Sequence, residues 1–249
     1  ELGPGTRLFW VDQSYVVYVP AGEFLMGNDE TTTSDHTPAH TVTLAGFWIH
    51  QTEVTNQMYA ACVDAGVCSL PDQGADGPYN NSRYANHPVV NIDWNQAETY
   101  CGWILGRLPT EAEWEKAARG TEGDPYPWGD DTPACELLNA GDCLDPSGTS
   151  AVRDYLLGAS PYDLADTAGN VFEWVRDWYG EDFYASSPAE NPTGPAEGTE
   201  RVFRGSGYQT PVDLLQVYLR NHLDPREQQD DLGFRCILTE ETVANPPPP

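Results

Sequence analysis

The chain has 249 residues, and its 39 acidic and 12 basic side chains give it a formal net charge of −27 at pH 7. Such a charge repels nucleic acid and anionic membranes, and no run of about 18 apolar residues is present, so neither nucleic-acid binding nor membrane insertion is expected. Glycine, proline and aromatic residues are all plentiful, which is typical of a loop-rich α+β domain.

The first elements expected along the chain are strands. Residues 15–20 are β-branched and aromatic and run into a Pro-Ala-Gly turn. Residues 24–27 form a short apolar run, and residues 40–44 alternate between polar and apolar side chains. Residues 47–49 are expected to continue the same sheet. Residues 1–14 are expected to form an N-terminal extension.

Three helices are predicted next, each beginning after a residue whose side-chain oxygen accepts a backbone N–H of the first turn. The expected caps are Thr55, Asp93 and Thr110. The first helix is expected to end near Ala65. The third is expected to bury a stripe that includes Trp114.

Beyond the helices the sequence predicts irregular structure. Residues 120–161 are rich in Gly, Pro, Asp and Ser and are expected to form a long ordered loop region. Residues 15–240 are interpreted as a single domain, and residues 241–249 as a proline-rich tail or the start of a linker to neighbouring domains. The chain begins at Glu1 without a signal-like apolar stretch, so a mature or excised piece is expected.

Six cysteines are present, without the CxxC spacing and nearby histidines that a zinc site needs. Four of them form two pairs that lie close together in the sequence, which leaves two distant cysteines for each other. The expected disulfides are Cys62–Cys68, Cys135–Cys143 and Cys101–Cys236. Disulfides imply an oxidising compartment, extracellular or periplasmic, for a secreted protein or a cell-surface ectodomain. The alternative is a set of buried free thiols in a cytosolic protein.

Seven sequence blocks, arranged in one order, resemble the family of formylglycine-generating enzymes, the FGE-sulfatase family. They include VPAGEFLMG at 19–27, GRLPTEAEWEKAARG at 106–120, AGNVFEWVRDWY at 168–179 and LGFRC at 232–236. The likeness extends over residues 17–237. It implies a C-type-lectin-like α+β fold with much irregular loop structure.

The resemblance fails at the positions that carry the chemistry. In the family's enzymes, the segment that corresponds to residues 201–236 holds a pair of redox-active cysteines, and here those positions are Thr210 and Leu215. A thiolate is the copper ligand and the reactive group, and neither a hydroxyl nor an isobutyl group replaces it. No copper, no catalytic residue and no formylglycine-generating oxidase activity are therefore expected.

Calcium is the metal that the resemblance implies, because relatives bind it through two segments that mix carboxylates with backbone carbonyls. The implied ligand residues are Asp166, Gly169, Val171, Glu173, Asn139 and Ala140. A later acid, Asp142 or Asp145, would complete the second site. The alternative is that these acids only cap turns.

A polar and aromatic face is predicted between residues 207 and 231, where side chains typical of binding surfaces alternate with an apolar framework. Its expected members are Tyr208, Gln209, Thr210, Asp213, Gln216, Tyr218, Asn221, His222, Gln228 and Gln229. The pattern resembles the variable proteins of diversity-generating retroelements, and also the FGE-like ectodomains of bacterial receptor kinases. The expected ligand is a protein, peptide or glycan.

Two functions follow from these observations. The favoured hypothesis is a non-catalytic extracytoplasmic ligand-binding or sensor module, stabilised by disulfides and calcium, because no convergent acid, base, nucleophile or metal-thiolate set is visible. The alternative is an FGE-like enzyme with an altered active site that matures a peptide or small molecule by oxidation.

Overall fold

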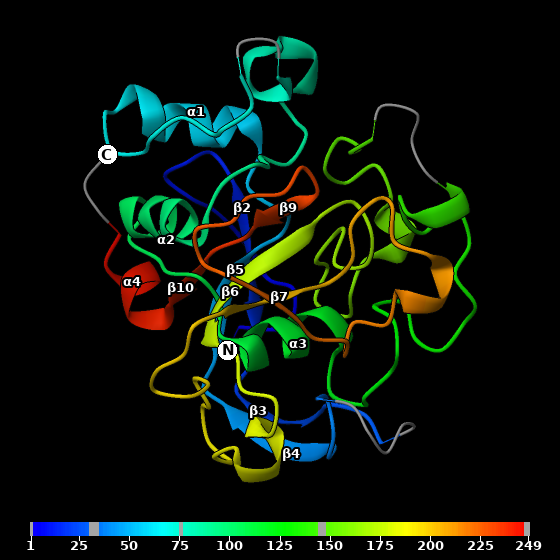
Figure 1. Ribbon diagram of the computed structural model, residues 1–249. Coiled ribbons are helices and arrows are strands. Elements are labelled where there is room, and N and C mark those ends of the chain that lie inside the picture. The colour runs from blue at the N-terminus through cyan, green and yellow to red at the C-terminus, as the bar shows by residue number, and fades with distance from the viewer. Residues whose placement is uncertain (1, 30–34, 75–76, 144–147, 247–249) are drawn as a thin grey trace.

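The protein is described from a computed structural model that covers residues 2–29, 35–74, 77–143 and 148–246 (Figure 1). The strands are β1 (Arg7–Phe9), β2 (Tyr15–Val19), β3 (Gly22–Met26), β4 (His40–Leu44), β5 (Phe47–His50), β6 (Phe172–Trp178), β7 (Arg201–Arg204), β8 (Asn221–Leu223), β9 (Leu232–Phe234) and β10 (Ile237–Thr239). The α-helices are α1 (Asn56–Asp64), α2 (Trp94–Trp103), α3 (Glu111–Arg119) and α4 (Glu240–Ala244). Short 3₁₀ helices are η1 (Pro78–Asn80), η2 (Ser82–Tyr84), η3 (Gly141–Cys143), η4 (Leu156–Gly158), η5 (Phe183–Ser186) and η6 (Val212–Leu214).

Three sheets organise the molecule. One has the strand order β1-β2-β5-β10, the second is the β3-β4 hairpin, and the third has the order β8-β7-β6-β9. All neighbours are antiparallel except β6 and β9, which are parallel. Helix α3 contacts β3 and β4 of the hairpin as well as β6 and β7 of the third sheet, so it joins these layers (Figure 1). The architecture is the α+β class that composition predicts.

The expectation that residues 47–49 continue the sheet of residues 40–44 is wrong. Among the described strands, β4 is paired with β3 in a two-stranded sheet, whereas β5 lies between β2 and β10 in a different sheet. The burial patterns give the reason. Every residue of β5 is buried, as in a central strand with both faces covered, whereas β4 alternates as a strand with one covered face does.

The three predicted helix starts are confirmed. Thr55, Asp93 and Thr110 each accept a hydrogen bond from the backbone N–H three residues later. The first helix ends at Asp64, with Ala65 as its C-cap. These starts need only neighbours in the sequence, which explains why local reasoning finds them.

Helix α3 is buried on every side, not only along the predicted stripe. Trp114 is 1% exposed, but the charged Glu115, Lys116 and Arg119 are buried as well. The Lys116 ammonium donates hydrogen bonds to the carbonyls of Pro20 and Gly22, where β2 turns into β3. Burial lowers the pKa of Lys116 to about 8. Charges inside a protein must be paired or hydrogen-bonded, so the charged side chains of α3 need partners on the elements packed around it.

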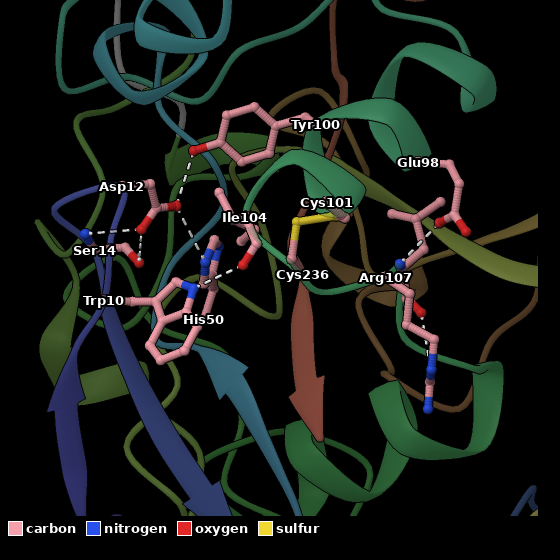
Figure 2. The surroundings of a disulfide bond; sticks show 11 residues. Trp10, Asp12, Ser14, His50, Glu98, Tyr100, Cys101, Ile104, Arg107 and Cys236 are labelled. Atoms are coloured by element: carbon pink, nitrogen blue, oxygen red, sulfur yellow. Dashed lines mark hydrogen bonds and ion pairs between the residues drawn. A yellow bond between two sulfur atoms is a disulfide. The ribbon is translucent and has the colours of Figure 1, made fainter. Parts of the chain in front are cut away.

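The three predicted disulfides are confirmed: Cys62–Cys68, Cys135–Cys143 and Cys101–Cys236. The Cys101–Cys236 disulfide links α2 to the short segment between β9 and β10 (Figure 2). Both cysteines are fully buried. Close to it, the Trp10 indole donates to the Ile104 carbonyl at 2.9 Å, and the Tyr100 hydroxyl donates to Asp12 at 2.9 Å. These bonds hold the β1–β2 turn against α2.

Strand β1 falls within residues 1–14 and is hydrogen-bonded to β2 as the edge of the first sheet. Residues 240–244 of the expected tail form α4. Among the described helices, none combines the length and the apolar character needed to cross a bilayer.

Candidate functional site

Three buried carboxylates surround one buried guanidinium at the centre of the predicted calcium region. Both oxygens of Glu173 accept hydrogen bonds from Arg235, at 2.6 and 2.7 Å, and one of them also accepts from the Trp114 indole at 2.8 Å. Asp166 accepts from a backbone N–H, and Glu53 accepts from the Asn170 side chain at 2.9 Å. If all three acids are ionised, they outnumber the single cation, so the cluster holds an excess of negative charge.

Burial makes this excess costly for the acids that lack a cationic partner. It raises the pKa of Asp166 to about 6, with the nearby Glu173 charge adding to the effect. Burial also raises the pKa of Glu53 well above its usual range, and the charge of Asp166 acts in the same direction. The second oxygen of Glu53 is buried without a hydrogen-bond partner among the described residues. A bound cation would relieve both effects.

The structure brings the two predicted calcium segments together. The backbone N–H of Asn170 donates to the carbonyl of Asn139 at 2.8 Å. Gly169 lies against the same residue with φ = 91°, and a Cβ placed on it would come within 2.8 Å of the Asn139 carbonyl oxygen. Ala140 and Val171 are buried on either side of this contact. A glycine is therefore required here both by its backbone conformation and by the close approach.

The fit of these residues to calcium is partial. The region offers the carboxylate and carbonyl oxygens that calcium prefers, including the unpartnered oxygen of Glu53. Glu173, however, is already bound to Arg235 and Trp114 through both oxygens. In the described part of the chain no three Asp, Glu, His or Cys side chains are arranged to hold one ion. Asp145 and the side chain of Asp142 lie outside the described residues. Calcium binding stays a prediction.

Sequence reasoning missed Glu53 and the cation that pairs with Glu173. That cation is Arg235, which lies 62 positions from Glu173 in the sequence. Glu53 lies just after a fully buried strand, within the stretch HQTEVTN. A lone acid inside such a stretch was a usable signal, because carboxylates are rarely buried without a structural or functional reason.

The predicted ligand face begins where the third sheet ends. Strand β7 stops at Arg204 on the same edge where β6, β8 and β9 start, as their registers show. The chain then turns, and the Tyr208 N–H donates to the Asn170 carbonyl at 2.8 Å. Tyr208 is partly exposed and Gln209 and Asp213 are exposed. These residues form an open polar surface over the end of the sheet.

The other members of the predicted face are spread over three places. Tyr218 is 7% exposed and packs against the His36 ring. His222 lies in β8, where its ring stacks on Tyr179 at 3.7 Å. The Gln228 side chain donates to Gln96 of α2. Gln216 and Asn221 are half-buried. The carbonyl of Gln229 accepts a hydrogen bond from the Asn91 N–H.

The two positions that lack the family's cysteines have ordinary structural roles. The Thr210 hydroxyl accepts a hydrogen bond from the Gly207 N–H at 3.0 Å and closes the turn after β7. Leu215 is 1% exposed and packs in an apolar cluster with Leu138 and Ala140. All six cysteines of the chain are paired elsewhere in disulfides, so none offers a thiolate at this surface.

A buried ionic network anchors the strand that carries this face. Arg204, the last residue of β7, contacts Glu111 at 2.7 Å and Glu115 at 2.6 Å. Arg220, just before β8, contacts the same Glu111 at 2.7 Å. Opposite charges surround Glu111 closely enough that its pKa is lowered although its own burial acts to raise it. The segment between the two arginines is thus tied to α3 at both ends.

The family model described as "Sulfatase-modifying factor enzyme 1-like domain" matches residues 11–240. The chain belongs to the FGE-sulfatase family. Formylglycine-generating enzyme from Streptomyces coelicolor is 35% identical over 278 residues, which cover 88% of this chain and 88% of the enzyme. The serine/threonine-protein kinase Pkn1 of Chlamydia caviae is 36% identical over 243 residues, covering 89% of this chain. The chain spans only 37% of the length of that kinase.

Two solved structures share the fold. PvdO from Pseudomonas aeruginosa aligns with a TM-score of 0.82 and 25% identity, over 95% of this chain and 99% of PvdO. Treponema denticola variable protein 1 aligns with a TM-score of 0.77 and 25% identity, over 91% of this chain and 95% of that protein. The expected C-type-lectin-like α+β fold of the FGE-sulfatase family is confirmed.

Proposed function

We propose that this FGE-sulfatase domain is a non-catalytic extracytoplasmic module that binds a protein, peptide or glycan. The observation that carries the proposal is the pair Thr210 and Leu215, which hold a turn and a core cluster where the family's enzymes have reactive cysteines. Three disulfides support an oxidising compartment. The polar surface at Tyr208, Gln209 and Asp213, backed by the buried ionic network, is the proposed binding surface.

Two relatives support the idea of a display or sensor domain. The Treponema protein is a variable protein with nearly the same extent as this chain, and Pkn1 is a kinase of which this chain matches about a third. In both cases a domain of this fold occurs in a protein that is not named as a formylglycine-generating enzyme. A module that presents a surface on a rigid framework is consistent with both.

Binding is tested by screening the labelled domain on glycan and peptide arrays. Any ligand found there should bind Tyr208→Ala and Gln209→Ala variants more weakly by roughly tenfold, the loss that central aromatic and polar contacts cause. Leu157→Ala is the matched control, because Leu157 is 72% exposed and lies in η4, outside the predicted ligand face. A ligand that binds all variants equally would show that the surface over the end of the sheet is not the binding site.

We also propose that calcium stabilises the domain through the Asp166 region. Calcium at a hundredfold excess over its Kd should stabilise the folded state by about 2.7 kcal/mol, and a chelator should remove this gain. Asp166→Ala removes the side-chain oxygens and should abolish the response, whereas Asp182→Ala, which changes an exposed acid, should keep it. A melting curve that is the same in chelator and in calcium would rule out the site.

The alternative is an enzyme with an altered site that matures a peptide or small molecule by oxidation. The match to formylglycine-generating enzyme over 88% of both chains supports it. Incubation with copper, oxygen and a cysteine-containing sulfatase peptide, followed by mass spectrometry, separates the two functions. We expect no conversion of the peptide cysteine. Conversion by the wild-type chain would refute the non-catalytic proposal, and a Thr210→Cys/Leu215→Cys variant tests whether the lost thiols suffice to restore it.

A further inference from the structure

A cavity of about 470 Å³ opens at a place that the proposed function does not use. It lies between the β1–β2 turn, the segment 51–55, the outer side of α1 and the loop at Val152 and Arg153. Small-molecule sites are typically of this size, with a few polar groups that fix the ligand. None of its lining residues belongs to the predicted ligand face.

The cavity contains an arginine without a protein partner. Arg153 lines the cavity, its Nε is buried, and its guanidinium makes no ion pair or hydrogen bond among the described residues. The buried Arg119, Arg204, Arg220 and Arg235 all contact carboxylates. In a chain with 39 acids and 12 bases, a half-buried guanidinium left unpaired stands out. Such a group needs an external partner, and the geometry of guanidinium favours a carboxylate.

The backbone holds Arg153 in a strained conformation. Its φ is 72°, in the left-handed region that non-glycine residues seldom adopt. Its N–H donates to Asp166 at 2.8 Å, and the N–H of Val152 donates to the Asn86 carbonyl at 3.0 Å. Strain of this kind persists where the surroundings fix it and is concentrated at functional sites. The guanidinium is therefore attached to a fixed point of the cavity wall.

Within the described part of the chain, a second unpartnered polar atom, on Gln51, is enclosed by the protein. Gln51 is 1% exposed, and its Nε2 donates to the Asp163 carbonyl at 3.0 Å and to the Asp163 carboxylate at 2.8 Å. These two acceptors fix the orientation of the amide, so its Oε1 is left as a buried acceptor without a partner among the described residues. This oxygen has almost no accessible surface, so a ligand in the cavity does not reach it, and the Arg153 guanidinium is the group that the wall offers.

Two acids also line the cavity, Asp12 and the exposed Asp64 at the end of α1, so a bound carboxylate must lie on the Arg153 side, away from Asp64. The Asp12 carboxylate is fully buried and accepts from the Ser14 hydroxyl at 2.6 Å and from Tyr100 (Figure 2). Tyr15 is 46% exposed and stands at the edge, with its ring against Phe9. The Tyr15 ring gives the cavity an apolar surface, as ligand pockets usually have.

From these features, we propose that the cavity binds a small organic carboxylate, up to the size of a sugar acid. The carboxylate pairs with the Arg153 guanidinium, and the carbon framework lies toward Tyr15. This site is independent of the surface at Tyr208, so either proposal can fail without the other.

The test is an NMR titration of the ¹⁵N-labelled chain at low ionic strength. The probes are D-glucuronate, D-gluconate and L-lactate at millimolar concentration, with D-glucose as the neutral control. We expect at least one acid to shift the amide signals of residues 13–15, 51–57 and 152–153, and D-glucose to leave them in place. No shift with any of the three acids, or equal shifts with D-glucuronate and D-glucose, would overturn the proposal.

Variants assign the binding to the cavity. Arg153→Asn removes the guanidinium with a residue that tolerates the left-handed backbone, and should weaken binding roughly tenfold or more. The exposed Arg176 makes no side-chain contact with the described residues, so Arg176→Asn is the charge-matched control. Ala61→Trp should fill the cavity from α1 and block binding without a change of charge, whereas Ala65→Trp, at the C-cap outside the cavity, should not. Unchanged affinity in Arg153→Asn or in Ala61→Trp refutes the site.

Discussion

Replacement of Arg235 by methionine should be among the most destabilising single changes in this domain. The guanidinium is fully buried and donates to both oxygens of Glu173 and to the carbonyls of His50, Gln51 and Ala165. Removing one partner of a buried ion pair costs about 3–5 kcal/mol, because it leaves the other charge uncompensated. Here three carbonyls lose a donor as well, which places the expected cost at the upper end of that range.

Urea denaturation measures this cost as a free energy of unfolding. In thermal denaturation, a domain of this size should show a fall in Tm of roughly 6–20 °C. Arg176→Met is the control, because it changes an exposed arginine on β6, the strand of Glu173, and should stay within about 0.5 kcal/mol of wild type. The double variant Arg235→Met/Glu173→Met should cost less than the sum of its two single changes. A cost below about 1.5 kcal/mol for Arg235→Met, or strict additivity in the double variant, would refute the ion pair as the centre of this cluster.

Two further predictions concern the disulfides and the pH dependence of stability. The loop-entropy estimate is about 5 kcal/mol for Cys101–Cys236, whose cysteines are 135 positions apart, and about 2.2 kcal/mol for Cys62–Cys68, which are 6 apart. Replacing Cys101 and Cys236 by alanine should therefore lower the urea midpoint about twice as much as replacing Cys62 and Cys68. Equal losses for the two double variants would contradict the estimate. Burial, with the nearby Glu111 charge, raises the pKa of Asp177 from 3.8 to about 8. The folded state then holds the extra proton between these values, so stability should fall as pH rises through that window, and Asp177→Asn should make this fall smaller in urea titrations at its two ends.

Several local features of the site region could be predicted from the sequence alone. Thr55, Asp93 and Thr110 cap their helices through contacts that reach three residues along the chain, so no tertiary information is needed to see them. The disulfides followed from the spacing of six cysteines, and the family followed from the order of its sequence blocks. The assignment of β4 and β5 to one sheet failed because pairing partners are chosen by burial, which adjacency in the sequence does not reveal.

Neither the carboxylate cluster around Arg235 nor the cavity at Arg153 could be drawn from the sequence, because each is assembled from distant segments. Glu173 was predicted as a calcium ligand, yet the fold places it against Arg235, and it places the unpredicted Glu53 nearby. The cavity at Arg153 likewise joins four separate stretches of chain. The sequence by itself determined the family, the helix starts, the cysteine pairing and the absence of a thiol at Thr210. Tertiary structure alone decided which buried charges meet and which remain unpaired, since burial and Coulomb interactions depend on distance in space.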